Sequence, residues 1–251
     1  MKIIALYSSK GGVGKTAAAV NLAYASACRG MNTLLCDLDS QGAAGYYYRI
    51  RPKSKFNRKK FLQGNLESYI RGTDFRRLDL LPAHFSFRNL DLALDRQNID
   101  GKAFRKLLKP LGDEYDILIL DCPPNMTRLS ENIIRAADLV VTPLIPTTLS
   151  VLAFAQLVKL FDKLEVKRSK LCCFFSMTER RKIMHVDTIT RFRKKKSFLR
   201  RMIPYLADIE KMGIHRKPVA ATAPRSRAAE AYNRLWLEIY HRSEKYDRNG
   251  G

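Results

Sequence analysis

Short apolar runs alternate with helix-forming segments along the first third of the chain. Residues 2–7 form a run typical of a buried strand, a glycine-rich turn follows, and residues 17–28 favour a helix. Gly30 lies where a helix C-terminus favours glycine, and residues 33–37 form a second apolar run. A strand, loop, helix and strand within about 37 residues indicate a βαβ unit, which requires parallel strands.

The same alternation continues towards the C-terminus. The later apolar runs are nearly continuous, so the strands that they predict are buried on both faces of a sheet. We therefore expect an α/β protein with a doubly wound, mainly parallel sheet flanked by helices. Further strands are predicted at residues 78–81, 116–120, 138–144, 170–177 and 200–203, and further helices at residues 149–164 and 228–241.

Length and composition favour one domain. The 251 residues are 46% hydrophobic, which is enough to bury a core, so we expect a single domain over residues 1–251. Residues 248–251 are expected to form a frayed tail. No run of about 18 apolar residues predicts a membrane span, and the start of the chain lacks the pattern of a signal peptide.

The five cysteines lie in apolar runs and include no C-x-x-C pair, which indicates reduced, buried thiols in a cytosolic protein. Cys172 and Cys173 are adjacent, so in a strand their side chains would point to opposite faces. They could not bind one metal ion together, and we expect neither a zinc site nor an iron–sulfur cluster.

A glycine-rich loop joins the first predicted strand to the first predicted helix. Residues 9–16 (SKGGVGKT) match the phosphate-binding pattern G-x-x-x-x-G-K-[ST], except that Ser9 replaces the first glycine. Glycines let the backbone wrap around phosphate groups, and the helix N-terminus adds a favourable dipole. Lys15 would reach the β- and γ-phosphates, and Thr16 would bind Mg²⁺. The residues expected to bind nucleotide here are Lys10, Gly11, Gly12, Val13, Gly14, Lys15, Thr16 and Ala17.

The string KGGVGKT at residues 10–16 resembles the deviant Walker A motif of the ParA/MinD family of P-loop ATPases. The resemblance implies a P-loop NTPase fold, ATP and Mg²⁺ as cofactors, and a homodimer that encloses ATP between its protomers. It also implies that Lys10 crosses to the partner's nucleotide. There a second cation would stabilise the charge that develops on the transferred phosphoryl group.

Residues 36–42 (CDLDSQG) resemble the second motif of this family, although Ser40 stands where proline is common. Two carboxylates at the carboxyl end of a strand lie opposite the phosphate loop in such folds. By resemblance, Asp39 polarises the attacking water and Asp37 supports the metal shell.

Residues 117–124 (ILILDCPP) resemble the Walker B segment, in which an apolar strand carries Asp121 to its end. There its carboxylate would hold a Mg²⁺-bound water. The three motifs follow one another in the order of the family. The expected catalytic residues are Lys10, Lys15 and Asp39, and the expected Mg²⁺ residues, partly through water, are Thr16, Asp37 and Asp121.

The resemblance also implies that adenine lies near the ends of the later strands. It points to Met177, which follows Ser176, and to Pro204 and Tyr205. Adenine pockets of this kind consist largely of backbone and apolar contacts, so an ordinary core role for these residues remains an open alternative.

The chain is strongly basic, with 46 Lys and Arg against 24 Asp and Glu and a formal net charge of +22. Such an excess indicates a polyanionic partner, either nucleic acid or an anionic membrane surface. Residues 49–60 contain seven basic and no acidic residues, and residues 159–201 contain fifteen basic and four acidic residues. The first segment could be a loop that contacts a partner, and its role stays open.

Members of the ParA-like branch bind DNA without sequence preference as ATP dimers, through basic residues in the C-terminal half. The resemblance therefore implies salt-dependent binding of DNA and a ParB-like or other adaptor that stimulates slow ATP hydrolysis. It implies a cytoplasmic, nucleoid-associated protein that drives plasmid or chromosome partition or positions a cargo. Since no helix-turn-helix extension precedes the motifs, operator binding is not expected. The candidate DNA contacts are Arg180, Arg181, Lys182, Arg191, Arg193, Lys194, Lys195, Lys196, Arg200 and Arg201.

Two alternatives remain. The MinD-like branch binds an anionic membrane through a C-terminal amphipathic helix. Here that helix carries Glu230 and Glu238 beside an apolar stripe typical of a core, so we expect no stable membrane anchor. A metabolic P-loop enzyme, such as dethiobiotin synthetase or a cobyrinate amidase, is the second alternative, and Lys10 and the charge of +22 disfavour it.

Overall fold

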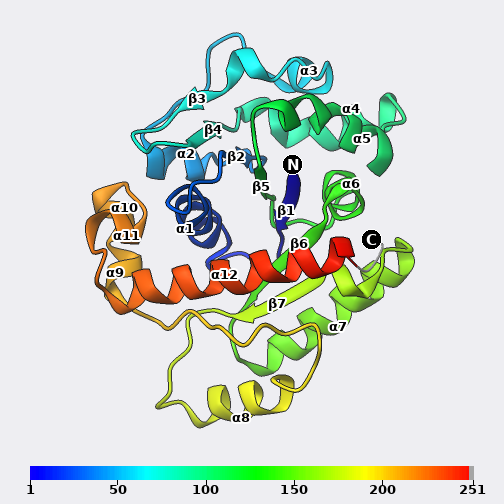
Figure 1. The fold of residues 1–251 in the computed structure, drawn as a ribbon. Coiled ribbons are helices and arrows are strands. Elements are labelled where there is room, and N and C mark those ends of the chain that lie inside the picture. Colours follow the sequence, from blue (N-terminus) through cyan, green and yellow to red (C-terminus); the bar gives the residue numbers. More distant parts are fainter. Residues whose placement is uncertain (249–251) are drawn as a thin grey trace.

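The computed structural model describes residues 1–248, and its centre is a seven-stranded sheet in the order β3-β4-β2-β5-β1-β6-β7 (Figure 1). β3 pairs antiparallel with β4, and all other neighbouring strands in this sheet are parallel. The doubly wound, mainly parallel sheet that the sequence predicts is confirmed. The strands are β1 (Lys2–Leu6), β2 (Thr33–Asp37), β3 (Arg71–Gly72), β4 (Leu78–Leu81), β5 (Ile117–Asp121), β6 (Leu139–Leu144) and β7 (Leu171–Phe175).

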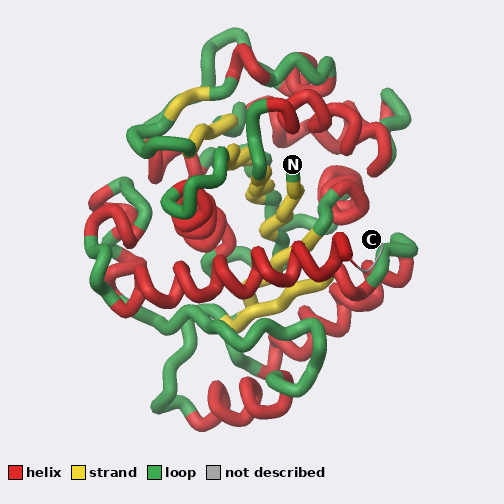
Figure 2. Tube along the Cα trace, viewed as in Figure 1, coloured by secondary structure: helices red, strands yellow, loops and turns green. Residues whose placement is uncertain are grey.

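Helices cover both faces of the sheet (Figure 2). One hydrophobic core packs the sheet against α1 and α12, and the other packs it against α4, α5, α6 and α7. Alternate residues of a strand enter the two cores, as Ile3 and Ile4 do in β1. The helices are α1 (Lys15–Ala27), α2 (Ala43–Tyr48), α3 (Arg58–Leu62), α4 (Leu90–Arg96), α5 (Gly101–Leu108), α6 (Arg128–Ala136), α7 (Thr148–Lys163), α8 (Ile183–Phe192), α9 (Ala207–Glu210), α10 (Met212–His215), α11 (Val219–Thr222) and α12 (Arg227–Arg248).

The strand expected at residues 200–203 is wrong, because this segment follows β7 without continuous pairing. The N–H groups of Leu199 and Ile203 donate to carbonyls of β7 at 2.7 and 2.9 Å. Between them, the N–H groups of Arg200 and Arg201 donate instead to the carboxylate of Glu238 on α12, both at 2.8 Å. An acidic side chain from another element therefore takes the hydrogen bonds that a strand would have made.

The structure also differs from the sequence-based prediction at strand β3 and at the end of helix α12. β3 has only two residues and was not foreseen, since so short a segment has no periodicity to detect. Arg248 is the last residue of α12 rather than part of a tail, and residues 249–251 lie outside the described part of the chain. No helix among the described residues is long and apolar enough to span a bilayer.

The burial predicted for the cysteines is confirmed for four of the five. All five thiols are free, and Cys172 and Cys173 enter opposite hydrophobic cores, as their adjacency predicts. Cys36 and Cys122 are also buried. Cys28 is exposed, because it caps the C-terminus of α1, where the helix reaches the surface.

Candidate nucleotide site

The glycine-rich loop connects β1 to α1 at the carboxyl edge of the sheet. Gly12 and Gly14 adopt φ angles of 73° and 85°, a left-handed conformation that residues with a side chain rarely adopt. A Cβ added to Gly14 would lie 3.1 Å from Ser176 Oγ and 3.6 Å from Met177 Cε, so the loop packs closely against the segment after β7. At Gly11 and Gly12 the same addition would meet nothing within 4 Å, so this side of the loop is open.

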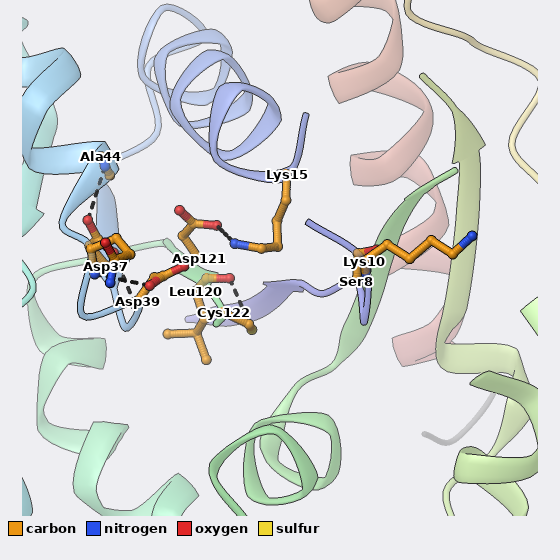
Figure 3. Close-up of polar contacts among 10 residues, drawn as sticks. Ser8, Lys10, Lys15, Asp37, Asp39, Ala44, Leu120, Asp121 and Cys122 are labelled. Atoms are coloured by element: carbon orange, nitrogen blue, oxygen red, sulfur yellow. Dashed lines mark hydrogen bonds and ion pairs between the residues drawn. The ribbon is translucent and has the colours of Figure 1, made fainter. Parts of the chain in front are cut away.

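Lys15 is the first residue of α1, and its side chain turns towards the end of β5 (Figure 3). Its Nζ donates to Asp121 Oδ1 at 2.9 Å, and the two side chains are 8% and 0% exposed. Burial acts to lower the pKa of Lys15, but the neighbouring Asp121 outweighs it, and the pKa of Lys15 lies above its ordinary value. The cation is therefore held charged inside the protein by one carboxylate.

Asp37 ends β2 and lies beside Asp121 in the register of β2 and β5. Its two oxygens accept the N–H groups of Asp39 at 3.1 Å and Ala44 at 3.0 Å, which orders the turn after β2. Complete burial raises the pKa of Asp37 well above its ordinary value, and the charge of Asp121 raises it further. Asp39 itself is only half-buried, and its Oδ1 accepts the N–H of Gln41 at 3.1 Å. Asp37 thus fixes the turn that presents Asp39.

The chemistry of this group fits Mg²⁺. Asp121 Oδ2 is buried and has no hydrogen-bond partner among the described residues, so one carboxylate oxygen is left for a ligand. Burial raises the pKa of Asp121, while the charge of Lys15 favours its charged form. The described residues contain no cluster of three or more His, Cys, Asp or Glu side chains that could hold a metal ion. Mg²⁺ is characteristically bound by one or two protein oxygens together with substrate phosphates and waters.

Lys10 lies on the same loop, but its side chain extends away from Asp39 and Asp121 (Figure 3). Its backbone N–H donates to Ser8 Oγ at 3.3 Å, which fixes the start of the loop. The side chain is half-buried. The two lysines of the loop therefore point in different directions, one into the carboxylate group and one out of it.

The residues expected near adenine come together at the end of β7. Met177 has a φ of 54° and contacts the loop at Gly14. Thr178 pairs with Pro204, and the N–H of Tyr205 donates to the Thr178 carbonyl at 3.1 Å. The Tyr205 side chain is 51% exposed, and its hydroxyl donates to Glu210. Met177, Pro204 and Tyr205 therefore form one surface beside the phosphate loop, and their contact with adenine stays a prediction.

All ten candidate DNA contacts are exposed, but the structure divides them between two places. Arg180, Arg181 and Lys182 precede α8, just beyond the carboxyl end of β7, and Lys182 pairs with Glu179. The others lie at or beyond the C-terminal end of α8, where Lys195 Nζ packs 5.7 Å from the ring centre of Phe192. The remaining members of this second group are Arg191, Arg193, Lys194, Lys196, Arg200 and Arg201.

Sequence reasoning missed two relationships at these sites. It assigned Lys15 to the nucleotide and Asp121 to the metal ion but did not foresee the ion pair between them. It also used Glu238 only as evidence against a membrane anchor and did not foresee that its carboxylate binds the backbone at Arg200 and Arg201. The motif order could have suggested the first contact, but no local sequence signal could have found the second.

Comparisons with known proteins agree with this geometry. Residues 1–172 match the family model AAA_31, described as an AAA domain. The chain is 29% identical over 254 residues to the chromosome partitioning protein ParA of Myxococcus xanthus, a match that covers 96% of this chain and 88% of that protein. It is also 29% identical over 251 residues to the sporulation initiation inhibitor protein Soj of Bacillus subtilis, covering 95% of this chain and 98% of that protein.

Among solved structures, the fold is similar to that of cobyrinic acid a,c-diamide synthase from Mycobacterium smegmatis with bound ATP analog and magnesium. The TM-score is 0.81 at 22% identity, and the match covers 96% of this chain and 94% of that one. At this identity the likeness shows a shared P-loop fold and no more. The family match and the two relatives go further: the chain belongs to the AAA_31 family of AAA domains, as a P-loop ATPase of the ParA/MinD type.

Proposed function

We propose that this protein, as a single domain, is a ParA-like ATPase that dimerises around ATP, binds DNA without sequence preference and hydrolyses ATP slowly. The observation that carries the proposal is the opposite orientation of Lys10 and Lys15 on one loop (Figure 3). Lys15 faces the carboxylates of its own site, while Lys10 faces away from them and is available to a second site. The likeness to the Myxococcus xanthus partitioning protein supports a role in plasmid or chromosome partition or in cargo positioning.

Different residues of the chain would bind the phosphates, hold Mg²⁺ and orient the attacking water. The N–H groups at residues 11–16 and the Lys15 ammonium would bind the β- and γ-phosphates, with Lys15 exchanging Asp121 for a phosphate oxygen. Mg²⁺, held by Thr16 and by Asp121 through water, would neutralise phosphate charge. Asp39, presented by the turn that Asp37 orders, would orient the attacking water.

Dimerisation would complete the site. Lys10 of each protomer would reach the nucleotide of the other and stabilise the charge that develops on the transferred phosphoryl group, as an arginine finger does. Because both nucleotides would lie between the protomers, ATP binding and dimerisation would be linked. Hydrolysis would then release the dimer and its DNA, and an adaptor protein resembling ParB would set the rate.

A second candidate, association with an anionic membrane, is favoured by one observation. Ile183, Met184 and Val186 at the start of α8 are 78%, 46% and 45% exposed, next to the basic residues that precede the helix. Exposed apolar and basic side chains together are typical of a helix that lies on a lipid surface. The C-terminal helix does not add to this candidate, because Leu235, Trp236 and Ile239 are fully buried.

One experiment separates the two candidates. The protein is sedimented with plasmid DNA or with vesicles that contain anionic lipid, each with ATP, with ADP and without nucleotide. We expect ATP-dependent retention by DNA that falls steeply with salt, and release on hydrolysis. Retention by vesicles alone would replace the DNA proposal with the membrane candidate. Equal retention by DNA in all three nucleotide states would refute a nucleotide-gated cycle.

A further inference from the structure

A cleft of about 880 Å³ lies between the C-terminal half of α12, the segment after α8 and the turn before β7. In Figure 1 this part of α12 is red, and the segment beside it runs from yellow to orange. Seven of its twelve lining residues are Lys or Arg, and Glu238 is the acidic one among them. They are Lys196, Arg200 and Arg201 from the segment, Arg234, Arg242 and Lys245 from α12, and Lys167 before β7.

Glu238 is the acidic residue of the cleft, and both of its oxygens accept backbone N–H groups. Oε1 accepts the N–H of Arg200 and Oε2 accepts the N–H of Arg201, each at 2.8 Å. These bonds hold the backbone of two consecutive arginines against α12. Their neighbours Leu199 and Ile203 donate instead to carbonyls of β7.

A second contact fixes the same segment to the helix. The Arg242 guanidinium donates to the carbonyl of Lys196, so both ends of the basic segment are tied to α12. Arg234, one turn before Glu238, pairs with the exposed Glu230. The cations of the cleft therefore stand on a fixed backbone, and a concave wall of one charge sign concentrates the electrostatic potential.

One part of the cleft lies at the opposite end of β7 from the nucleotide site, while Arg200 and Arg201 lie alongside the second half of the strand. Lys167 and Ser169 line it just before β7 begins at Leu171. Ser176 and Met177, which pack against the phosphate loop, follow the last residue of the strand.

We propose that this cleft binds the phosphate backbone of DNA, and that Glu238 is a positioning residue that aims Arg200 and Arg201 at it. The inference rests on the proposed function for the identity of the polyanion. It assigns DNA contact to one end of α8 and withdraws it from Arg180, Arg181 and Lys182 at the other end. Arg234, Arg242 and Lys245 on α12 join the contact surface.

The first test compares two double variants of the full chain that remove the same charge. With ATP, R200A/R201A should bind a labelled DNA duplex at least roughly tenfold more weakly. The slope of log affinity against log salt should fall by about two, one unit for each lost phosphate contact. The matched control R180A/R181A should change both values by less than about a quarter of that effect. A larger loss in R180A/R181A than in R200A/R201A would overturn the assignment of the cleft.

The second test asks whether replacing Glu238 weakens or strengthens DNA binding. Removing a negative charge from a basic cleft should strengthen DNA binding if only charge matters. If Glu238 positions the arginines, Glu238→Ala should weaken binding, and Glu238→Gln, which keeps one acceptor, should lie between Ala and the native residue. Glu230→Ala on the same helix is the control, and it should bind DNA equally or more tightly. Tighter binding by both Glu238 variants would overturn the positioning role.

The thermal midpoint and dimer mass of each variant show whether it is folded. If the native protein with ATP binds no DNA at all, the proposed function fails together with this inference. If the native protein binds DNA and the cleft variants bind it equally well, only the inference fails.

Discussion

Lys15 Nζ lies 2.9 Å from Asp121 Oδ1, and both side chains are buried at the base of the phosphate loop. Two residues that the motifs assign to phosphate and metal thus form an ion pair with each other. Removing one partner of such a buried ion pair strongly destabilises the folded protein, because the other charge is left buried without compensation. The contact favours the charged form of each group and holds both side chains in place at the base of the loop.

Lys15→Ala should remove measurable ATP binding. The ammonium is a charge-assisted donor to phosphate worth about 1.5–3 kcal/mol, and its loss also leaves Asp121 unpaired in the site. Calorimetric titration with a non-hydrolysable ATP analogue checks this. Lys106→Ala, at an exposed position of α5, is the control and should titrate like the native protein. Native affinity in Lys15→Ala would contradict the phosphate-loop assignment.

Asp39→Ala should preserve ATP binding and stop turnover. Positioned proton acceptors contribute about 10²–10⁴ to rate, so phosphate release should fall by at least about two orders of magnitude. The ATP-bound variant should then stay on DNA after the native protein has dissociated, which surface-immobilised DNA can record. Asp113→Ala, exposed and remote from the loop, is the matched control. Unchanged phosphate release would remove Asp39 from the catalytic set.

The Lys10→Ala variant should bind ATP, because the native Lys10 side chain faces away from the carboxylates of its own site. It should hydrolyse ATP poorly, because Lys10 would be missing from the nucleotide site of the partner. A mixture with Asp39→Ala gives a sharper result. In a mixed dimer, the Lys10→Ala protomer keeps its own Asp39 and receives Lys10 from its partner. An equal mixture of two inactive variants should therefore recover about a quarter of the native rate, since half the dimers would have one working site of two. No recovery would mean that Lys10 acts within its own protomer.

His185 should make the protein less stable in acid. It is 4% exposed, and its Nδ1 accepts the N–H of Glu179 at 3.1 Å, which requires a neutral ring with the proton on Nε2. Burial and the charge of Lys182 lower its pKa, against a smaller opposing effect of Glu179. Its stabilising effect is therefore complete above the unfolded pKa, about 6.5, and is lost as the pH falls through the folded value.

The free energy of unfolding, measured by urea titration between pH 5 and pH 8 (about 1.5 units either side of that pKa), checks this. The slope below about pH 6.5 should reach at most about 1.4 kcal/mol per pH unit for this one site. In His185→Asn that part of the slope should disappear, while His215→Asn, at an exposed histidine, should keep it. An unchanged slope in His185→Asn would assign the acid sensitivity to other groups.

Six of the seven strands could be predicted because each is a short apolar run buried on both faces. The phosphate loop could be located because glycines at positive φ, a lysine and a helix start must occur in a fixed order. What the sequence could not provide are relationships that depend on packing between distant elements. The Glu238 carboxylate accepts the N–H of Arg200, which is 38 residues away in the sequence, and no sequence pattern near either residue predicts this contact.

The division of the basic residues had the same cause. In the sequence, residues 180–201 form one positive segment, and charge counting treats it as one surface. In the fold, the chain leaves β7 before Arg180 and returns beside Thr178 at Pro204, and of these cations only Lys196, Arg200 and Arg201 line the cleft. Net charge indicated a polyanion, and only the fold could say which of the cations act together.

Both edges of the sheet are protected, and this limits how copies of the chain can assemble. Beyond β4, the outer strand β3 has two residues, too few to template another strand. Beyond β7, the segment from Leu199 to Ile203 occupies backbone carbonyls that an added strand would need. Polymerisation by strand addition is thereby disfavoured at each side. If the protein dimerises with ATP as proposed, its copies would associate through loops and helices, where contacts can be reversed without unfolding a sheet.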